Sequence, residues 1–237
     1  MTYESSAPDL KVMQIPGTPH YCLADDGAIS RLCCQTRRLD WDQSFLAIPE
    51  IAARLASGSV VIDAGAFIGD TTHLFLQRGC SVFAIEPQQD AFTVLEFNCP
   101  NAICIRKAVG ARGQSAVLTN TVSNTPPNNL GARQVAADPA GAPVLALDDL
   151  NPHRCDFMKM DVEGFEPFAL KGGEQFIRRT RPVLHIEVNL PALRSQGFAD
   201  HRSIYEPLEA WGYRITVPFM TERIGTDLPW DIVCLPE

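Results

Sequence analysis

The stretch that decides the fold is SVVIDAGAFIGDTTHLF, residues 59–75. An apolar run typical of a buried β-strand ends at Asp63, a short turn carries Gly65 and Gly69, and a helical pattern follows. A glycine turn between a strand and a helix places backbone N–H groups at the carboxyl end of the strand, where open α/β sheets bind ligands. The stretch therefore predicts a ligand site at the first strand of such a sheet.

Segments typical of strands and helices alternate after residue 59, which predicts an α/β sheet with crossover helices on both faces. The later segments YRITVPF and DIVCLPE are expected to pair as a C-terminal antiparallel hairpin, and SAVLTN to add an extra or edge strand. Residues 121–143 are rich in Asn, Pro, Gly and Ala and are predicted to form a long loop. The main strands are expected at SVVIDAG, SVFAIEP, AICIRKAV, DFMKMDV and PVLHIEVN.

The domain organisation follows from length and regularity. At 237 residues and 46% hydrophobic content the chain can bury one large core. Residues 1–58 are less regular, although LAIPEIAARLASG is predicted to be a helix that leads into the first strand. We expect residues 1–58 to cap one end of the sheet and residues 59–237 to form the core of the same domain.

Charge and cysteine content restrict the partners. A net charge of -8 and a pI near 5.1 argue against a nucleic-acid partner or an acidic membrane surface. Eight cysteines without a C-x-x-C pair favour buried thiols in a reducing compartment over a zinc site or disulfide framework. No run approaches the ~20 apolar residues of a membrane span. The expected location is the cytoplasm.

The glycine turn fits some ligands better than others. A dinucleotide motif G-x-G-x-x-G counted from Gly65 requires glycine where this chain has Phe67 and Asp70. The ring of Phe67 would keep a pyrophosphate from approaching the backbone of the turn. The carboxylate of Asp70 would repel the same group. S-adenosylmethionine has a sulfonium and an ammonium instead, so Asp63, Asp70 and Asp161 are expected to stabilise its cationic parts.

A further acid closes the second strand. Glu86 lies 23 positions after Asp63 (86 minus 63), an offset at which an acid accepts hydrogen bonds from ribose hydroxyls in nucleotide-binding α/β folds. Either acid taken alone is better explained as a cap of the helix that follows it. The ordered set favours the cofactor.

Six blocks of the sequence resemble the FkbM-type methyltransferases over residues 59–190: VIDAGAFIGD, AIEPQQDAF, RKAVG, LALDDL, DFMKMDVEGFEPFALKGG and LHIEVN. The resemblance implies a class I, Rossmann-like methyltransferase fold with a mostly parallel seven-stranded sheet. It also implies S-adenosylmethionine as methyl donor and a hydroxyl of a small natural product or sugar as acceptor. The alternatives are a nicotinamide-dependent oxidoreductase and a non-catalytic protein of the same fold.

The resemblance also implies which residues form the cofactor site. Departures from the family pattern at Phe67 and His73 leave the shape of the methionine pocket open. The resemblance places Lys107 and Ala108 near the adenine. The full predicted cofactor set is Asp63, Gly65, Ala66, Phe67, Gly69, Asp70, Thr71, Glu86, Pro87, Lys107, Ala108, Asp161 and Val162.

Methyl transfer to an alcohol needs a general base, and four residues at strand ends are candidates: Asp161, Glu163, His185 and Glu187. His185 and Glu187 alternate along one strand and therefore share a face, which is either the site or the packed core. The four residues also suit magnesium, but nothing in their spacing requires a metal and none is predicted.

The acceptor is expected to be a small molecule or glycan. The walls of its site are predicted from residues 121–143 and from the N-terminal segment around His20 and residues 41–45. Asn128, Asn129 and Arg133 are the candidate substrate-binding residues. Asn and Gly are also ordinary turn formers, so a turn in this stretch explains its composition equally well.

Overall fold

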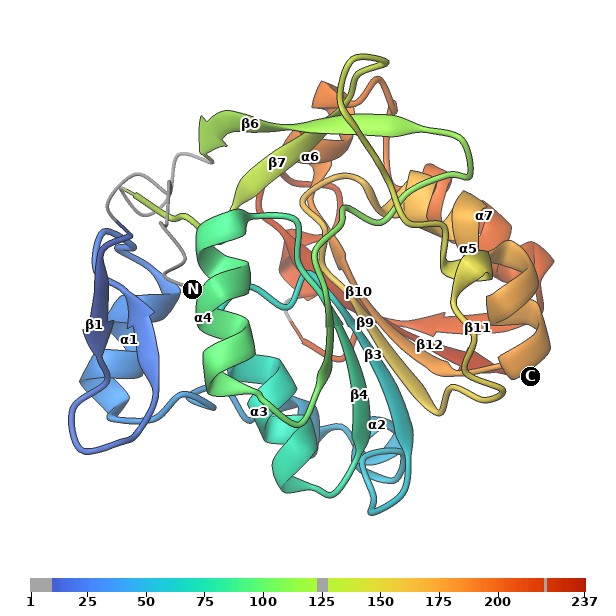
Figure 1. Cartoon of the computed structure of the whole chain (residues 1–237). Helices are drawn as coiled ribbons and strands as arrows, with labels where there is room; N and C mark the ends of the chain where they lie inside the picture. Colours follow the sequence, from blue (N-terminus) through green and yellow to red (C-terminus); the bar gives the residue numbers. More distant parts are fainter. Residues whose placement is uncertain (1–9, 123–127, 220) are drawn as a thin grey trace.

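A computed structural model describes residues 10–122, 128–219 and 221–237 and has a central seven-stranded sheet (Figure 1). The strand order is β11-β12-β10-β9-β3-β4-β5, and all neighbours pair in parallel except β12, which is antiparallel to β10 and β11. The fold is the predicted class I arrangement with its C-terminal hairpin. The strands are β3 (Val60–Ala64), β4 (Ser81–Ile85), β5 (Ile103–Ile105), β9 (Phe157–Met160), β10 (Val183–Val188), β11 (Tyr213–Thr216) and β12 (Trp230–Pro236).

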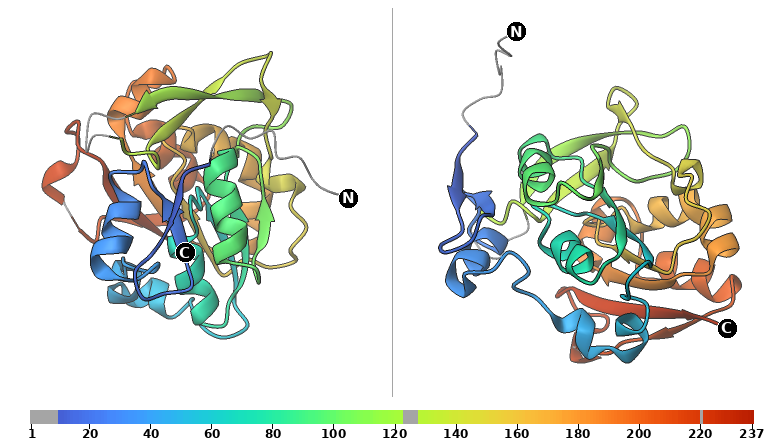
Figure 2. Two further views of the ribbon diagram at one scale, coloured as in Figure 1. Left: turned by 60° about the vertical axis from the view of Figure 1, so that its left-hand side comes forward. Right: turned by 60° about the horizontal axis from the view of Figure 1, so that its bottom comes forward.

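Helices cover both faces of this sheet, as Figures 1 and 2 show. One face packs against α5 and α7 through a large apolar cluster, and the other packs against α2, α3 and α4. Pro167 lies in the first turn of α5, where its missing N–H leaves no helical bond unmade. The helices are α1 (Ile29–Thr36), α2 (Pro49–Ala52), α3 (Asp70–Gln77), α4 (Gln89–Asn98), α5 (Glu166–Thr180), α6 (Leu190–Ser195) and α7 (Arg202–Ala210), with short 3-10 turns at Ser44–Ala47, Leu147–Asp149 and Thr221–Arg223.

The expected loop over 121–143 is wrong in part. A three-stranded antiparallel sheet, in the order β7-β6-β8, lies above the central sheet in Figure 1. SAVLTN therefore starts a strand of this small sheet and adds nothing to the edge of the central one. The strands are β6 (Ser115–Val122), β7 (Arg133–Ala137) and β8 (Ala142–Pro143).

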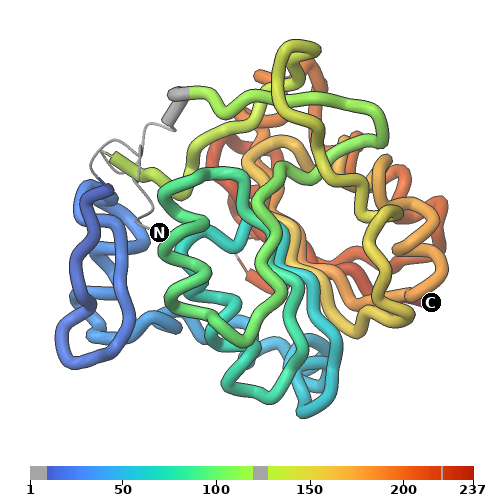
Figure 3. The backbone as a smooth tube through the Cα atoms, viewed as in Figure 1, coloured from blue at the N-terminus to red at the C-terminus, as the bar shows by residue number. Residues whose placement is uncertain are grey.

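The N-terminal segment caps one side of the molecule, beside α4 (Figure 3). It contains a hairpin of β1 (Val12–Gln14) and β2 (Tyr21–Leu23), followed by α1. Asn98 of α4 fixes the hairpin, because its side-chain amide donates to the carbonyl of Tyr21 and accepts from the N–H of the same residue. The helix predicted over LAIPEIAARLASG is reduced to a 3-10 turn and the four residues of α2.

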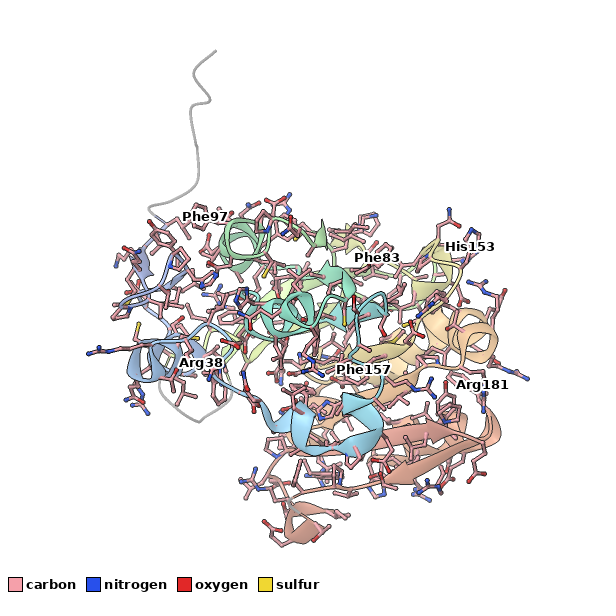
Figure 4. The ribbon with its side chains drawn as sticks, turned by 90° about the horizontal axis from the view of Figure 1, so that it is seen from below. Arg38, Phe83, Phe97, His153, Phe157 and Arg181 are labelled. Carbon is pink, nitrogen blue, oxygen red and sulfur yellow. The ribbon has the colours of Figure 1, made fainter. Side chains whose placement is uncertain are left out.

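Side chains within the described ranges fill the interior closely. Figure 4 shows Phe157 in the middle of the molecule, with Arg38 and Arg181 at opposite sides. All eight cysteines are free and six are buried, so they pack as apolar side chains. In the described ranges, no helix is both long enough and apolar enough to cross a membrane.

Candidate functional site

One face of the central sheet changes from apolar to charged along its strands. Val61, Phe157, Val183 and Val233 belong to one apolar cluster under α2 and α3. Because side chains alternate along a strand, the residues two positions further on lie on the same face. These are Asp63, Lys159 and His185, with Glu187 beyond them and Asp231 opposite Glu187 on β12.

A cavity of about 300 Å³ opens above these residues, at the end of the sheet where β3, β9 and β10 finish. Most of the predicted site residues line it, including all four candidate bases. Those on the wall are Gly65, Phe67, Asp70, Thr71, Glu86, Pro87, Lys107, Ala108, Asn129, Arg133, Asp161, Val162, Glu163, His185 and Glu187. Asp63, Ala66, Gly69 and Asn128 are not on the wall.

Asp63, predicted to meet the cofactor, lies behind the cavity wall and is fully buried. Its Oδ2 accepts hydrogen bonds from the hydroxyls of Thr71 (2.8 Å) and Thr72 (2.6 Å), which begin α3. Its Oδ1 lies 3.7 Å from the ammonium of Lys159. Asp63 therefore holds α3 against the sheet. The sequence predicts this role only as that of an acid capping the following helix.

Lys159 links the turn that follows β3 to the turn that follows β9. Its ammonium donates to the carbonyl of Gly65 at 3.0 Å and lies 3.2 Å from Oδ2 of Asp161. The side chain is 8% exposed, and the carboxylates around it raise its pKa although burial alone lowers it. Lys159 is therefore charged in the folded protein and neutralises part of an acidic surface.

The turn after β3 is shaped by close backbone approach. Gly65 has φ +85, and a Cβ there would overlap the carbonyl of Asp161 on the neighbouring strand. Gly69 has φ +92, and a Cβ there would lie 2.7 Å from Sγ of Cys99. Phe67 also adopts a positive φ of 45, and its ring lies on the cavity wall, as the steric argument against a dinucleotide expects. Both glycines are therefore required by geometry.

Glu86 closes β4 and is almost completely buried at the cavity wall, with 3% exposure. Its two carboxylate oxygens accept backbone N–H groups from Phe67 (3.0 Å) and Gln88 (2.8 Å). Burial raises its pKa to about 7, and those two hydrogen bonds oppose the rise. Each oxygen retains acceptor capacity toward the cavity, since a carboxylate oxygen has two lone pairs.

The turn after β9 brings two more acids to the wall. Glu163 and Gly164 both have positive φ, and Oε1 of the buried Glu166 accepts the N–H groups of Val162 and Gly164. Glu166 thus fixes the conformation that points Glu163 into the site. Burial first, and then the charge of Asp161, raise the pKa of both Glu163 and Glu187 well above the ordinary value.

His185 lies against the ring of Phe45, with centroids 4.8 Å apart. Burial and the charge of Lys159 lower its pKa to about 4, so the imidazole is neutral near pH 7. Its Nε2 lies 3.8 Å from Oδ1 of Asp231, beyond hydrogen-bond distance. Its Nδ1 is buried and has no hydrogen-bond partner among the described residues.

Asp231 and Asp42 line the cavity, although neither is among the site residues predicted individually from the sequence. Burial and the charge of Asp161 raise the pKa of Asp231 to about 7. The only sequence signal for Asp231 was its place at the start of the expected hairpin, beside the strand that carries Glu187. Asp42 lies in the N-terminal stretch proposed as a wall, whereas His20 of the same proposal contacts the ring of His73 edge-to-face and does not line the cavity.

The acceptor side of the cavity joins the N-terminal segment to β7. Trp41 and Phe45 supply apolar wall, and Asn129 and Arg133 supply polar groups. Nε of Arg133 is buried and has no hydrogen-bond partner among the described residues. Asn128 is exposed outside the cavity, so its predicted contact with substrate has no geometric basis here.

The raised carboxyl pKa values predict how stability depends on pH. Asp70, Glu86, Glu166 and Asp231 all have pKa values near 7 in the folded chain. A carboxyl with a raised pKa binds its proton more tightly in the folded state, so the free energy of unfolding falls as pH rises from ~4 to ~7.

We expect Asp231→Asn to flatten this fall by on the order of 1–2 kcal/mol, after discounting for its partly exposed side chain. Urea unfolding at several pH values measures the effect, with the exposed Glu174→Gln as control. A stability that increases between pH ~5 and ~8 contradicts the prediction.

Comparison with known proteins identifies the family. The family model described as the methyltransferase FkbM domain matches residues 63–215. The chain belongs to this family. The predicted fold and family are therefore confirmed, and the expected cofactor class agrees with both. None of the curated proteins matches the sequence.

Three solved structures of similar fold are distant from this chain in sequence. The FkbM methyltransferase of Methylobacillus flagellatus is 18% identical at a TM-score of 0.51, with 86% of the present chain and 54% of that chain covered. The present chain thus spans about half the length of that protein. Magnesium protoporphyrin IX methyltransferase from Synechocystis, solved with bound S-adenosylmethionine, is 11% identical at a TM-score of 0.52, with 89% of the present chain and 85% of that chain covered. A putative rRNA methylase from Clostridium thermocellum is 10% identical at a TM-score of 0.53, with 81% of the present chain and 95% of that chain covered.

Proposed function

We propose that this chain is an S-adenosylmethionine-dependent O-methyltransferase that acts on a hydroxyl of a small natural product or sugar. The observation that carries the proposal is the acidic cavity wall at the strand ends, where Asp231 has a pKa of about 7. An alcohol must lose its proton during transfer, and a general base works best when its pKa lies near the operating pH.

The residues present fit the cofactor. Glu86 is buried at the cavity with free acceptor capacity, which suits the two ribose hydroxyls. Gly65 lines the cavity at the turn, and Asp70 places a carboxyl group at the start of α3 for the cationic methionine part. The cofactor supplies an electrophilic methyl group on its sulfonium.

The chain's own groups then have to align the acceptor and take its proton. As the acceptor oxygen bonds to the methyl carbon, the sulfur–carbon bond breaks and its electron pair stays on sulfur. The hydroxyl proton passes to a carboxylate of the wall, and Asp231, with its pKa of about 7, is assigned this role. His185, with its pKa near 4, is assigned to contact the acceptor in its neutral form.

A small acceptor is favoured over a nucleic acid. The net charge of -8 and the carboxylates on the wall repel phosphate groups. Asn129 and Arg133 offer hydrogen bonds to hydroxyl or acidic groups of such an acceptor. The likeness to a putative rRNA methylase concerns the fold alone.

The test begins with calorimetric titration of S-adenosylhomocysteine into the purified chain. Donor labelled with ¹³C in the methyl group is then mixed with a panel of hydroxylated and amine acceptors. We expect the label to appear as a methoxy carbon. Asp231→Asn should lower kcat by about 10²-fold, the lower end of a general-base contribution, without weakening S-adenosylhomocysteine binding. Product labelled only as N-methyl, or binding without any transfer, contradicts O-methylation.

A further inference from the structure

Three carboxylates converge at one end of the cavity. Asp161 and Glu163 follow β9, and Glu187 lies near the end of β10. One oxygen from each lies within 4.8 Å of those of the other two. All three residues line the cavity and are only partly exposed, so the group is open to a ligand on one side.

The group lacks the partners that buried carboxylates normally have. Oε2 of Glu163 and Oε2 of Glu187 are buried without a hydrogen-bond donor among the described residues. Lys159 reaches Asp161, but no lysine or arginine of the described ranges forms an ion pair with Glu163 or Glu187. Buried carboxylates without a counter-charge are costly, so binding of a cation is the simplest way to complete the group.

A second unpartnered group faces the same space. His185 is 9% exposed, lines the cavity, and has no hydrogen-bond partner for its Nδ1 within the described part of the chain. Neutral imidazole can accept a hydrogen bond from a metal-bound water or from an acceptor hydroxyl. The cavity thus presents both cation ligands and a group suited to orient what the cation holds.

We propose that Asp161, Glu163 and Glu187 bind one divalent cation, Mg²⁺ or Mn²⁺, which holds the acceptor hydroxyl beside the methyl donor. Both ions take oxygen ligands, and magnesium is usually held by one or two carboxylates with water or substrate in its remaining positions. Coordination of one ion requires these three oxygens, which lie within 4.8 Å of one another, to approach more closely. Contact with the cation lowers the pKa of the acceptor hydroxyl, which then releases its proton to Asp231. The role in transfer rests on the proposed function, whereas the cation site does not.

The test is a Mn²⁺ titration of the whole chain after treatment with a chelator, with free Mn²⁺ followed by electron paramagnetic resonance. We expect one ion per chain. Glu163→Gln and Glu187→Gln should each weaken binding by at least about tenfold, equivalent to ~1.4 kcal/mol.

The matched control is Asp42→Asn, which removes one negative charge from the same cavity outside the three ligands. The Asn side chain keeps the oxygen that accepts the N–H of Ser44 at 2.8 Å. Its Mn²⁺ affinity should stay within about threefold of the unchanged chain. Equal losses in all three variants mean diffuse attraction and overturn the site, as does the lack of saturable binding by the unchanged chain.

Titration of S-adenosylhomocysteine into the same metal-free sample separates this proposal from the proposed function. Binding of S-adenosylhomocysteine without Mn²⁺ binding overturns the cation site and leaves the methyltransferase function standing. Binding of Mn²⁺ without S-adenosylhomocysteine supports the site and counts against the function. Thermal melts show whether each variant is folded.

Discussion

Replacing Lys159 by methionine is expected to lower the free energy of unfolding by about 3–5 kcal/mol, the cost of breaking a buried ion pair from one side. Lys159 is 6% exposed and is the cation shared by Asp63 and Asp161. Methionine fills similar space without a charge, so Asp63 keeps a buried Oδ1 with no counter-charge. Urea denaturation at constant pH measures the loss.

Two controls decide whether charge is the cause. Lys11→Met removes a lysine from an exposed pair with Asp25 and should cost less than about 1 kcal/mol. Adding Asp63→Asn to Lys159→Met should restore part of the stability, because the amide oxygen still accepts from Thr71 and Thr72. A Lys159→Met variant as stable as Lys11→Met shows that the ion pairs contribute nothing.

The sequence predicts the charged face of the sheet well, because strand periodicity is a local property. His185 and Glu187 share the cavity face as their alternation predicts, and Val183 continues that face into the core. The glycine turn is predicted from an equally local pattern, an apolar strand followed by glycines and a helix. Its geometry makes the glycines necessary, since Gly65 approaches the backbone of Asp161 across the sheet.

Long-range pairing explains what was missed. β7, RQVAA, is short and follows a stretch of turn-forming residues, so nothing local marks it as a strand. It forms by pairing with β6, and the register shifts between Leu118 and Val122. The three-residue strands β1 and β2 are likewise too short for periodicity to appear.

Individual side-chain roles in the site were harder still to predict. Asp63 has the position of a cofactor acid in the sequence, and in the structure its Oδ2 accepts hydrogen bonds from the hydroxyls of Thr71 and Thr72. Asp231 reaches the site because antiparallel pairing sets it opposite Glu187. The place of Asp231 depends on pairing between segments far apart in the chain, and the role of Asp63 depends on where its side chain points, and one sequence reveals neither.

Glu86→Ala is expected to weaken S-adenosylhomocysteine binding by about 10²–10⁴-fold. A hydrogen bond to a charged group contributes about 1.5–3 kcal/mol, and two ribose hydroxyls would lose such a partner. The variant also leaves the N–H groups of Phe67 and Gln88 without their acceptor. In the unchanged chain their hydrogen bonds to Glu86 fix the shape of the cavity wall. Calorimetry near pH 8, above the Glu86 pKa of about 7, keeps the carboxyl of the unchanged chain ionised.

The control is Glu96→Ala, which removes an exposed acid from α4 and should leave the affinity for S-adenosylhomocysteine unchanged. Thermal melts without ligand separate a folding defect from a binding defect, because only a binding defect removes the rise in melting temperature on adding S-adenosylhomocysteine. If folded Glu86→Ala binds within about threefold of the unchanged chain, the ribose lies elsewhere. The backbone hydrogen bonds to Phe67 and Gln88 are then sufficient reason for a buried acid at the end of β4.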